Sequence, residues 1–162
     1  MNDMAHAVLR LLDENKIDYT LAEHPAVFNM EELYAQGLEH CEAIAKNLLV
    51  RDQKKRFYWL LVLYGEKRAD LKALKGRLGH GALSFAGPEE LNALLGLTPG
   101  SVSPFGVLND AEHQVTLLLD EDYRDKLIGI HPNDNTATVF LPANQLAALL
   151  RAQGSPVEFI PF

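Results

Sequence analysis

The segment from Ile44 to Tyr64 constrains the fold most strongly, because it has the pattern of a buried β-hairpin. It reads Ile-Ala-Lys-Asn-Leu-Leu-Val, then the polar loop Arg51–Arg56, then Phe-Tyr-Trp-Leu-Leu-Val-Leu-Tyr. Two β-rich apolar runs around a short polar loop indicate a hairpin, and the second run is apolar enough for a strand covered on both faces. Lys46 and Asn47 stand inside the first run, although lysine is rarely buried without a partner. These two polar residues require an explanation from the rest of the chain.

The length of the chain favours one domain, spanning residues 1–162, with a sizeable core. Its 48% hydrophobic and 23% charged residues are ordinary for a soluble globular protein. No apolar run approaches the roughly 18–20 residues of a membrane span, and the N-terminus lacks a secretory pattern. Cys41 is the only cysteine, which excludes an internal disulfide and fits a reducing compartment. We therefore expect a cytoplasmic protein that does not act at a membrane.

The net charge of −7 argues against a general nucleic-acid binder, but the charge is unevenly distributed. Between Lys46 and Arg77 there are ten basic and three acidic residues, so this segment carries +7 and the remainder −14. A basic segment on an acidic protein can form a docking face for a polyanion. The alternative is a solvated loop followed by a solvated helix face.

Capping residues, apolar spacing and glycine or proline stops predict the other elements. Helices are expected from a cap at Asn2 or Asp3 to near Asn15, over Met30–Gln36 after a cap at Asn29, after a cap at Asp70 to about Leu78, from Pro88 to about Leu95, and from Pro142 to about Gln153. Strands are expected over 17–21, 83–86, 114–120, 127–130, 136–141 and 157–160, in addition to the hairpin. This mixture predicts an α/β protein of the mixed α+β type, with a central, mixed, largely antiparallel sheet and helices packed around it.

Several common chemistries lack their sequence signatures. The chain contains no Gly-x-Ser-x-Gly elbow, no Walker phosphate loop and no dinucleotide fingerprint. Its six histidines are scattered, without a His-x-x-x-His or Cys-x-x-Cys pair. We expect no metal site and no cofactor.

Three polar clusters remain in otherwise structural surroundings: Lys46-Asn47, the Gly100–Pro104 loop, and His131–Thr138. Each has a structural interpretation when taken alone. Lys46 could extend from a strand edge towards solvent, the glycine loop could be a tight connection, and the third cluster could be a hairpin turn.

Together these clusters resemble the prolyl-tRNA editing domain family, which comprises the insertion domain of bacterial prolyl-tRNA synthetases and its free-standing deacylase relatives. The resemblance rests on motifs that run in the family's order along most of the chain: His24-Pro25, Lys46-Asn47-Leu48-Leu49-Val50-Arg51-Asp52, Asp70-Leu71-Lys72, Leu83-Ser84-Phe85-Ala86, Leu95-Gly96, Gly100-Ser101-Val102-Ser103-Pro104-Phe105-Gly106, His131-Pro132 and Asn135-Thr136-Ala137-Thr138. Leu49 and Val50 depart from the Phe-Leu that is frequent in the family, but they remain apolar.

The resemblance implies a trans-editing deacylase that hydrolyses the ester of mischarged proline tRNA. Among the free-standing branches the match is closest to the one that removes alanine, while the branch that removes cysteine shares the same lysine and loop motifs. Mischarged proline tRNA is the implied partner, and prolyl-tRNA synthetase is a second one that the resemblance allows. A non-catalytic module that binds aminoacyl-tRNA or an amino acid is the alternative from a different class.

The implied catalytic residues are Lys46, Gly100, Ser101 and His131. Backbone N–H groups of Gly100 and Ser101 would stabilise the charge that develops on the carbonyl oxygen, and Lys46 would hold the terminal phosphate or ribose. His131 would border the pocket and bond the substrate, or act as general base. The expected substrate-binding residues are Asn47, Val27, Phe28, Ser103, Pro104, Phe105, Asn135 and Thr136.

The basic segment is the expected contact with the acceptor stem. Its candidate tRNA-binding residues are Lys54, Lys55, Arg56, Lys67, Arg68, Lys72 and Lys75. Such contacts predict tRNA binding that weakens strongly with salt.

Overall fold

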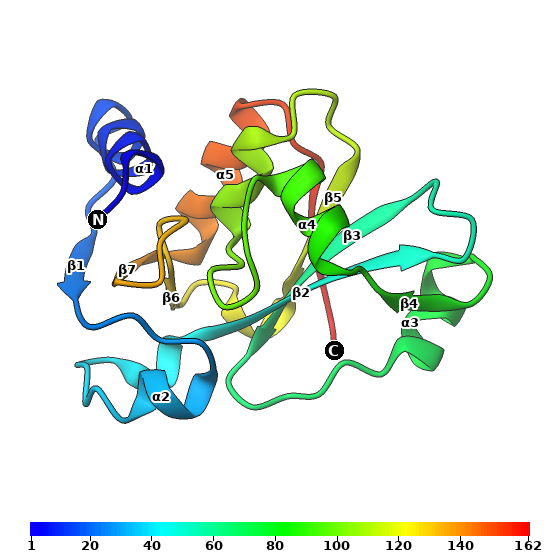
Figure 1. The fold of residues 1–162 in the computed structure, drawn as a ribbon, viewed down its shortest axis with the longest axis horizontal. Coiled ribbons are helices and arrows are strands. Elements are labelled where there is room, and N and C mark those ends of the chain that lie inside the picture. The colour runs from blue at the N-terminus through cyan, green and yellow to red at the C-terminus, as the bar shows by residue number, and fades with distance from the viewer.

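A computed structural model describes residues 1–162 and confirms the mixed α+β class (Figure 1). The helices are α1 (Asp3–Glu14), α2 (Met30–Tyr34), α3 (Leu71–Leu78), α4 (Pro88–Leu95) and α5 (Ala143–Ala152). The strands are β1 (Thr20–Glu23), β2 (Ala45–Asp52), β3 (Tyr58–Tyr64), β4 (Leu83–Phe85), β5 (Val115–Asp120), β6 (Leu127–Ile130), β7 (Ala137–Pro142) and β8 (Val157–Ile160). Short 3₁₀ helices occupy Cys41–Ala43, Pro104–Asn109 and Glu121–Tyr123.

The strands divide into two sheets, where the sequence suggested one central sheet. The larger sheet has the order β4-β2-β3-β5-β8, and the smaller one has the order β1-β7-β6. The β6–β7 hairpin pairs with β1 and does not extend the larger sheet. A single parallel bridge between Ile44 and Gly129 joins the two sheets. Four of the strand pairings are antiparallel, and only β3–β5 and β5–β8 are parallel.

The predicted hairpin is confirmed as β2 and β3, which pair antiparallel from Ala45 opposite Tyr64 to Arg51 opposite Tyr58. β3 is the middle strand of the larger sheet, and Leu60–Leu63 have no exposed surface. Apolar groups therefore cover both faces of β3, as the unbroken apolar run predicts.

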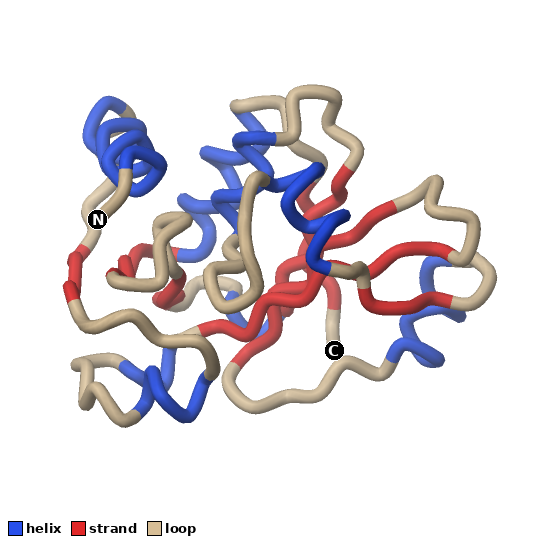
Figure 2. The backbone as a smooth tube through the Cα atoms, in the orientation of Figure 1, coloured by secondary structure: helices blue, strands red, loops and turns tan.

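The two faces of the larger sheet bury different cores. One face joins the main core, which includes Leu49 and Val62 and is closed by α1, α4, α5 and the smaller sheet. The other face packs Val50 and Leu61 against Leu74 of α3. Figures 1 and 2 show α2 near the beginning of β2, and α3 near the turn that follows its end. The two ends of β2 therefore lie in separate regions of the molecule.

The predicted helix caps at Asn29 and Asp70 are confirmed, and of the two candidates for the first helix the cap is Asn2 and not Asp3. Each capping side chain accepts a hydrogen bond from a first-turn N–H. The first strand begins later than the expected 17–21. The N–H of Ile17 still bonds the carbonyl of Leu12 and completes the end of α1, so pairing with β7 starts only at Thr20. No helix of the chain has the length and apolar character that crossing a membrane requires.

Candidate functional site

A pocket of about 270 Å³ opens where β2 begins, beside α2 and the bridge between the two sheets. It is built from five separate segments, and more than half of its lining residues are apolar. The lining residues are Val27, Phe28, Asn29, Met30, Leu33, Ile44, Ala45, Lys46, Asn47, Leu48, Gly100, Val102, Gly129, Ile130, His131 and Thr138. Residues from all three polar clusters of the sequence therefore meet at one pocket.

Lys46 is the only lysine among the pocket residues, which include no arginine. It is half-buried, donates no hydrogen bond and takes part in none of the ion pairs of the chain. Since neighbouring side chains of a strand point to opposite faces, Lys46 lies on the face of Val50, and Asn47 lies on the face of Leu49. The two polar residues thus border the pocket from opposite faces of β2.

Asn47 has an incompletely satisfied side chain. Its amide nitrogen is 3.5 Å from the carbonyl oxygen of Ala45, at the limit of a hydrogen bond. Its Oδ1 is buried without any partner. Because an unpaired buried amide oxygen is costly, Asn47 is a polar group that the fold alone does not explain.

His131 is held in one orientation and one tautomer. Its Nδ1 lies 2.7 Å from the carbonyl oxygen of Ala137, and a carbonyl can only accept, so Nδ1 carries the proton. Burial lowers the pKa of His131, and the nearby ring of His24 acts in the same direction. The neutral imidazole therefore offers the lone pair of Nε2 as an acceptor beside the pocket.

Thr138 is a fully buried hydroxyl in the pocket wall, and His24 orients it. Nδ1 of His24 donates to the carbonyl of Pro25 at 2.9 Å, so Nε2 accepts from Oγ1 of Thr138 at 2.9 Å. With its proton directed to His24, the hydroxyl presents lone pairs to other groups.

The glycine loop supplies free backbone donors, but not the pair expected. The N–H of Ser101 bonds the carbonyl of Thr98 at 3.1 Å, and its hydroxyl is also bound to Thr98. The N–H groups of Gly100 and Val102 have no partner in the chain. The structure therefore shifts the second free donor from Ser101 to Val102. Gly100 has φ +92°, a conformation that favours glycine.

The other expected substrate residues divide into pocket walls and supports. Val27 and Phe28 line the pocket, whereas Ser103 and Phe105 are fully buried and do not reach it. Pro104, Asn135 and Thr136 are also absent from the lining. The hydroxyl of Ser103 donates to the carbonyl of His131, and Pro104 is buried. The side chain of Asn135 donates to the carbonyl of Val27 at 2.8 Å, and the hydroxyl of Thr136 donates to Asp134 at 2.8 Å.

Most of the basic candidates lie on the surface, away from the pocket. Lys54, Lys55 and Arg56 form the exposed tip between β2 and β3, and Arg68, Lys72 and Lys75 are exposed before and on α3. Lys67 is different, because its ammonium group is bound by Asp120 and Asp122.

The structure adds pocket residues for which the sequence gave no separate reason. They include Met30, Leu33, Ile44 and Gly129. A Cβ at Gly129 would lie 2.6 Å from the ring of Phe140 and 3.1 Å from Ile44, so glycine is required where the sheets meet. His24 and Thr138 both belong to motifs that carry the family resemblance. Those motifs were therefore the one sequence signal that could have indicated the hydrogen bond between them.

No three His, Cys, Asp or Glu side chains gather into a group that could hold a metal ion. The polar groups at the pocket are one lysine ammonium, a neutral imidazole, the amides of Asn29 and Asn47, a hydroxyl and free backbone N–H groups. This set suits an ester or another polar carbonyl compound, with donors for oxygen and acceptors for protons.

Comparison with known proteins assigns the class of the chain. Residues 24–149 match the model of the aminoacyl-tRNA editing domain, and the chain belongs to this family. It is 41% identical over 159 residues to the prolyl-tRNA editing protein ProX of Acetoanaerobium sticklandii, covering 98% of this chain and 97% of that protein.

Two further comparisons agree in sequence and in fold. The prolyl-tRNA synthetase associated domain-containing protein 1 of Danio rerio is 31% identical, with 96% of this chain and 86% of that protein covered. A solved structure assigned provisionally as a trans-editing enzyme for prolyl tRNA synthetase superposes with a TM-score of 0.74 at 25% identity. That superposition covers 100% of this chain and 99% of the other.

Proposed function

We propose that this chain hydrolyses the ester between a wrong amino acid and the 3′ end of proline tRNA, and that alanine is the amino acid removed. The observation that carries the proposal is the pocket at the start of β2. It combines the unpaired Lys46, the neutral His131 and free loop N–H groups with an apolar lining. Membership of the aminoacyl-tRNA editing family and the relation to ProX support the same reaction. The proposed partner is mischarged proline tRNA, and a cytoplasmic location belongs to the same proposal.

In the proposed reaction, water adds to the ester carbonyl, the bond from carbon to the ribose oxygen breaks, and that oxygen leaves with a proton. Free amino acid and uncharged tRNA are the products. An aminoacyl ester is already activated, so a positioned water suffices without a metal. The N–H groups of Gly100 and Val102 stabilise the negative charge that develops on the carbonyl oxygen. Nε2 of His131 accepts the proton of the water, directly or through the neighbouring ribose hydroxyl.

Lys46 has the role of binding the terminal phosphate of the RNA. A lysine ammonium forms strong charge-assisted hydrogen bonds with phosphate oxygens. Every other lysine or arginine is absent from the pocket lining, so no other basic side chain could replace it there. This role explains a cation inside a mostly apolar strand.

The pocket supports selection of a small side chain. Met30, Leu33 and Ile44 give it apolar walls, which suit a methyl group. A synthetase built for proline cannot fully exclude the smaller alanine, and a second site too small for proline can then remove it. The exposed cations of the β2–β3 tip and α3 provide the proposed contacts with the acceptor stem, and the synthetase is a further proposed partner.

The test is a deacylation assay with alanyl-, cysteinyl-, seryl- and prolyl-tRNA for proline, using purified protein and measuring release of the amino acid. We expect rapid turnover of the alanyl species and none of the prolyl species. Preference for the cysteinyl species would keep the reaction and replace its substrate. Failure to hydrolyse any mischarged species would contradict the enzyme and favour a binding module.

A further inference from the structure

Phe28 is the most exposed large apolar side chain of the chain. Its relative exposure is 65%, compared with 53% for Phe85 and 46% for Phe57. Of these three phenylalanines, only Phe28 lines the pocket. A phenylalanine that selected the amino acid side chain from inside the pocket would bury its ring, whereas the ring of Phe28 is exposed to solvent at the pocket rim.

The backbone around Phe28 is held in place from several sides. Val27 exchanges two hydrogen bonds with Asn135, at 3.2 Å and 2.8 Å. The N–H of Phe28 donates to Glu32 at 2.7 Å. Phe28 packs against Gly100, where an added Cβ would be 3.2 Å from Cδ1 and 3.3 Å from Cα of Phe28. The backbone that carries the exposed ring is therefore held in place, and positioning a contact group before binding reduces the entropy cost of association.

A nucleotide is the ligand that such a rim fits. If the ester carbonyl reacts inside the pocket, the ribose that carries it lies at the mouth, and the attached base must pass the rim. Unpaired bases stack on aromatic side chains. Lys46 lines the same pocket with a free ammonium group, so one aromatic face and one cation are available for a base and its phosphate.

We infer that Phe28 is the platform on which the terminal base of the aminoacylated RNA stacks while its ester is hydrolysed. This inference rests on the proposed deacylase function and adds the recognition of the base to it. It makes Phe28 a residue that binds RNA, whereas the selection of the amino acid belongs to the buried walls.

The test combines variants of Phe28 with variants of the base. Deacylation is measured on alanyl-RNA minihelices that end either in adenosine or in an abasic nucleotide. For the adenosine-terminated substrate, we expect F28L to raise KM about 5- to 150-fold, the range expected for loss of one stacked base, and to change kcat less than twofold. F28W keeps the KM of the wild type. On the abasic substrate F28L and wild type have the same KM.

F28L keeps an apolar side chain without a ring, so a phenylalanine that only walls the pocket tolerates it. Phe85→Leu is the matched control, because it removes an exposed ring on β4, outside the pocket, and leaves KM unchanged. An equal rise in KM for F28L on the adenosine-terminated and the abasic substrates would overturn the inference. The inference would also be overturned if F28L changed the preference between alanyl and cysteinyl esters but left the difference in KM between the adenosine-terminated and abasic substrates as in the wild type.

A binding measurement separates this inference from the proposed activity. Adenosine 5′-monophosphate and ribose 5-phosphate are titrated into the wild type and F28L, and the backbone amide shift of Gly100 is followed by NMR. We expect the wild type to bind the nucleotide at least fivefold more tightly than the sugar phosphate, and F28L to lose this difference. Equal binding of the two, or binding of neither, contradicts the platform even if the protein hydrolyses mischarged tRNA. A wild type that shows the difference but hydrolyses nothing refutes the deacylase alone.

Discussion

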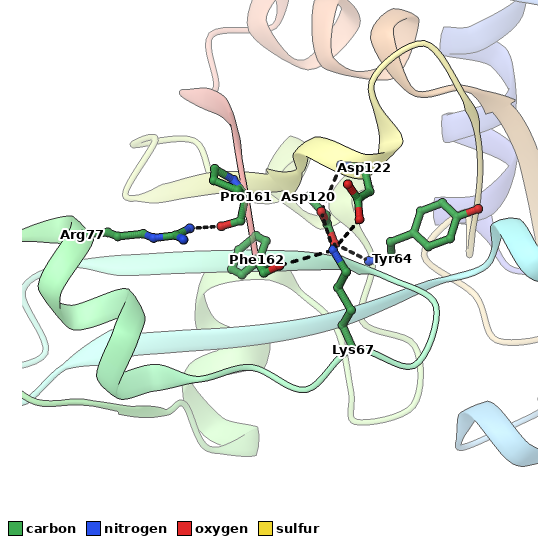
Figure 3. A network of polar contacts seen from close by, with 7 residues as sticks. All are labelled: Tyr64, Lys67, Arg77, Asp120, Asp122, Pro161 and Phe162. Atoms are coloured by element: carbon green, nitrogen blue, oxygen red, sulfur yellow. Dashed lines mark hydrogen bonds and ion pairs between the residues drawn. The ribbon is translucent and has the colours of Figure 1, made fainter.

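Lys46 lies in the first strand of the β2–β3 hairpin and Lys67 just after the second, yet only Lys67 is paired with acidic side chains of the chain. Figure 3 shows the ammonium group of Lys67 surrounded by acceptors. Its Nζ is 3.0 Å from Asp120, 2.6 Å from Asp122 and 3.4 Å from the carbonyl oxygen of Phe162. Lys46 has no such partner and stands at an apolar pocket.

The carboxylates that bind the Lys67 ammonium group indicate a structural role for this lysine. Asp120 is fully buried and also accepts the N–H groups of Tyr64, at 2.9 Å, and Asp122, at 3.0 Å. Burial acts to lower the pKa of Lys67, but the bonds to Asp122 and Asp120 outweigh it and raise the pKa. Lys67 thus neutralises a buried carboxylate between β3 and β5. We therefore propose a structural role for Lys67 in place of the expected tRNA contact, while Lys46 keeps a free charge for a ligand.

The largest effect should come from Lys46→Ala. Because no other lysine or arginine lines the pocket, we expect kcat/KM for deacylation to fall about 10²-fold, as the loss of charge-assisted bonds to a phosphate predicts. The free energy of unfolding should change by no more than about 0.5 kcal/mol, since no bond within the protein is lost. Single-turnover kinetics and urea denaturation measure the two quantities. Full activity in this variant would remove Lys46 from the mechanism.

Lys67→Ala should give the opposite pattern. It leaves Asp120 buried without its cation, and loss of one partner of a buried ion pair costs about 3 kcal/mol. We expect a corresponding loss in urea denaturation, and kcat/KM within twofold of wild type at a temperature where the variant is folded. If kcat/KM of Lys67→Ala falls as far as that of Lys46→Ala while its stability is retained, Lys67 acts in the reaction and its ion pairs do not define its role.

The sequence could identify Lys46 but could not separate it from Lys67. A lysine and an asparagine inside an apolar strand are anomalous in the local pattern, and the hairpin, its register and the helix caps follow from local pattern as well. The partners of Lys67 lie more than fifty residues away along the chain, and no local rule pairs them. The same limit explains the division into two sheets, because that division depends on contacts between segments. The occupied N–H of Ser101 is different: it bonds Thr98 within the same loop, and the glycine and proline pattern predicts a loop without specifying which of its N–H groups are bonded.

His131 is intermediate between the two lysines, with one nitrogen bonded and one free. Burial lowers its pKa, so it stays neutral to a lower pH than an ordinary histidine at about 6.5. We expect kcat/KM to be constant near neutrality and to decline only below that ordinary value, as protonation removes the acceptor at Nε2. His131→Ala should lower kcat/KM about a hundredfold and abolish this decline, which a pH–rate profile on alanyl-tRNA will show. An unchanged profile in the variant would assign the acceptor role to another group.

The smallest effect belongs to charges that are free but lie outside the pocket. Lys54 and Lys55 are exposed at the β2–β3 tip and enter no ion pair. Reversing both to Glu should weaken tRNA binding about tenfold at low salt and reduce the slope of log K against log salt by about 2, one for each lost phosphate contact. Hydrolysis of bound substrate should keep its kcat, because the pocket is untouched. The matched control reverses Arg10 and Lys16 on and just after α1, which changes the net charge equally in another region (Figure 1). Equal weakening of tRNA binding in both variants would reflect the total charge of the protein. Unchanged affinity in the tip variant would make the tip a solvated surface. Only a loss of affinity specific to the tip variant identifies a docking face.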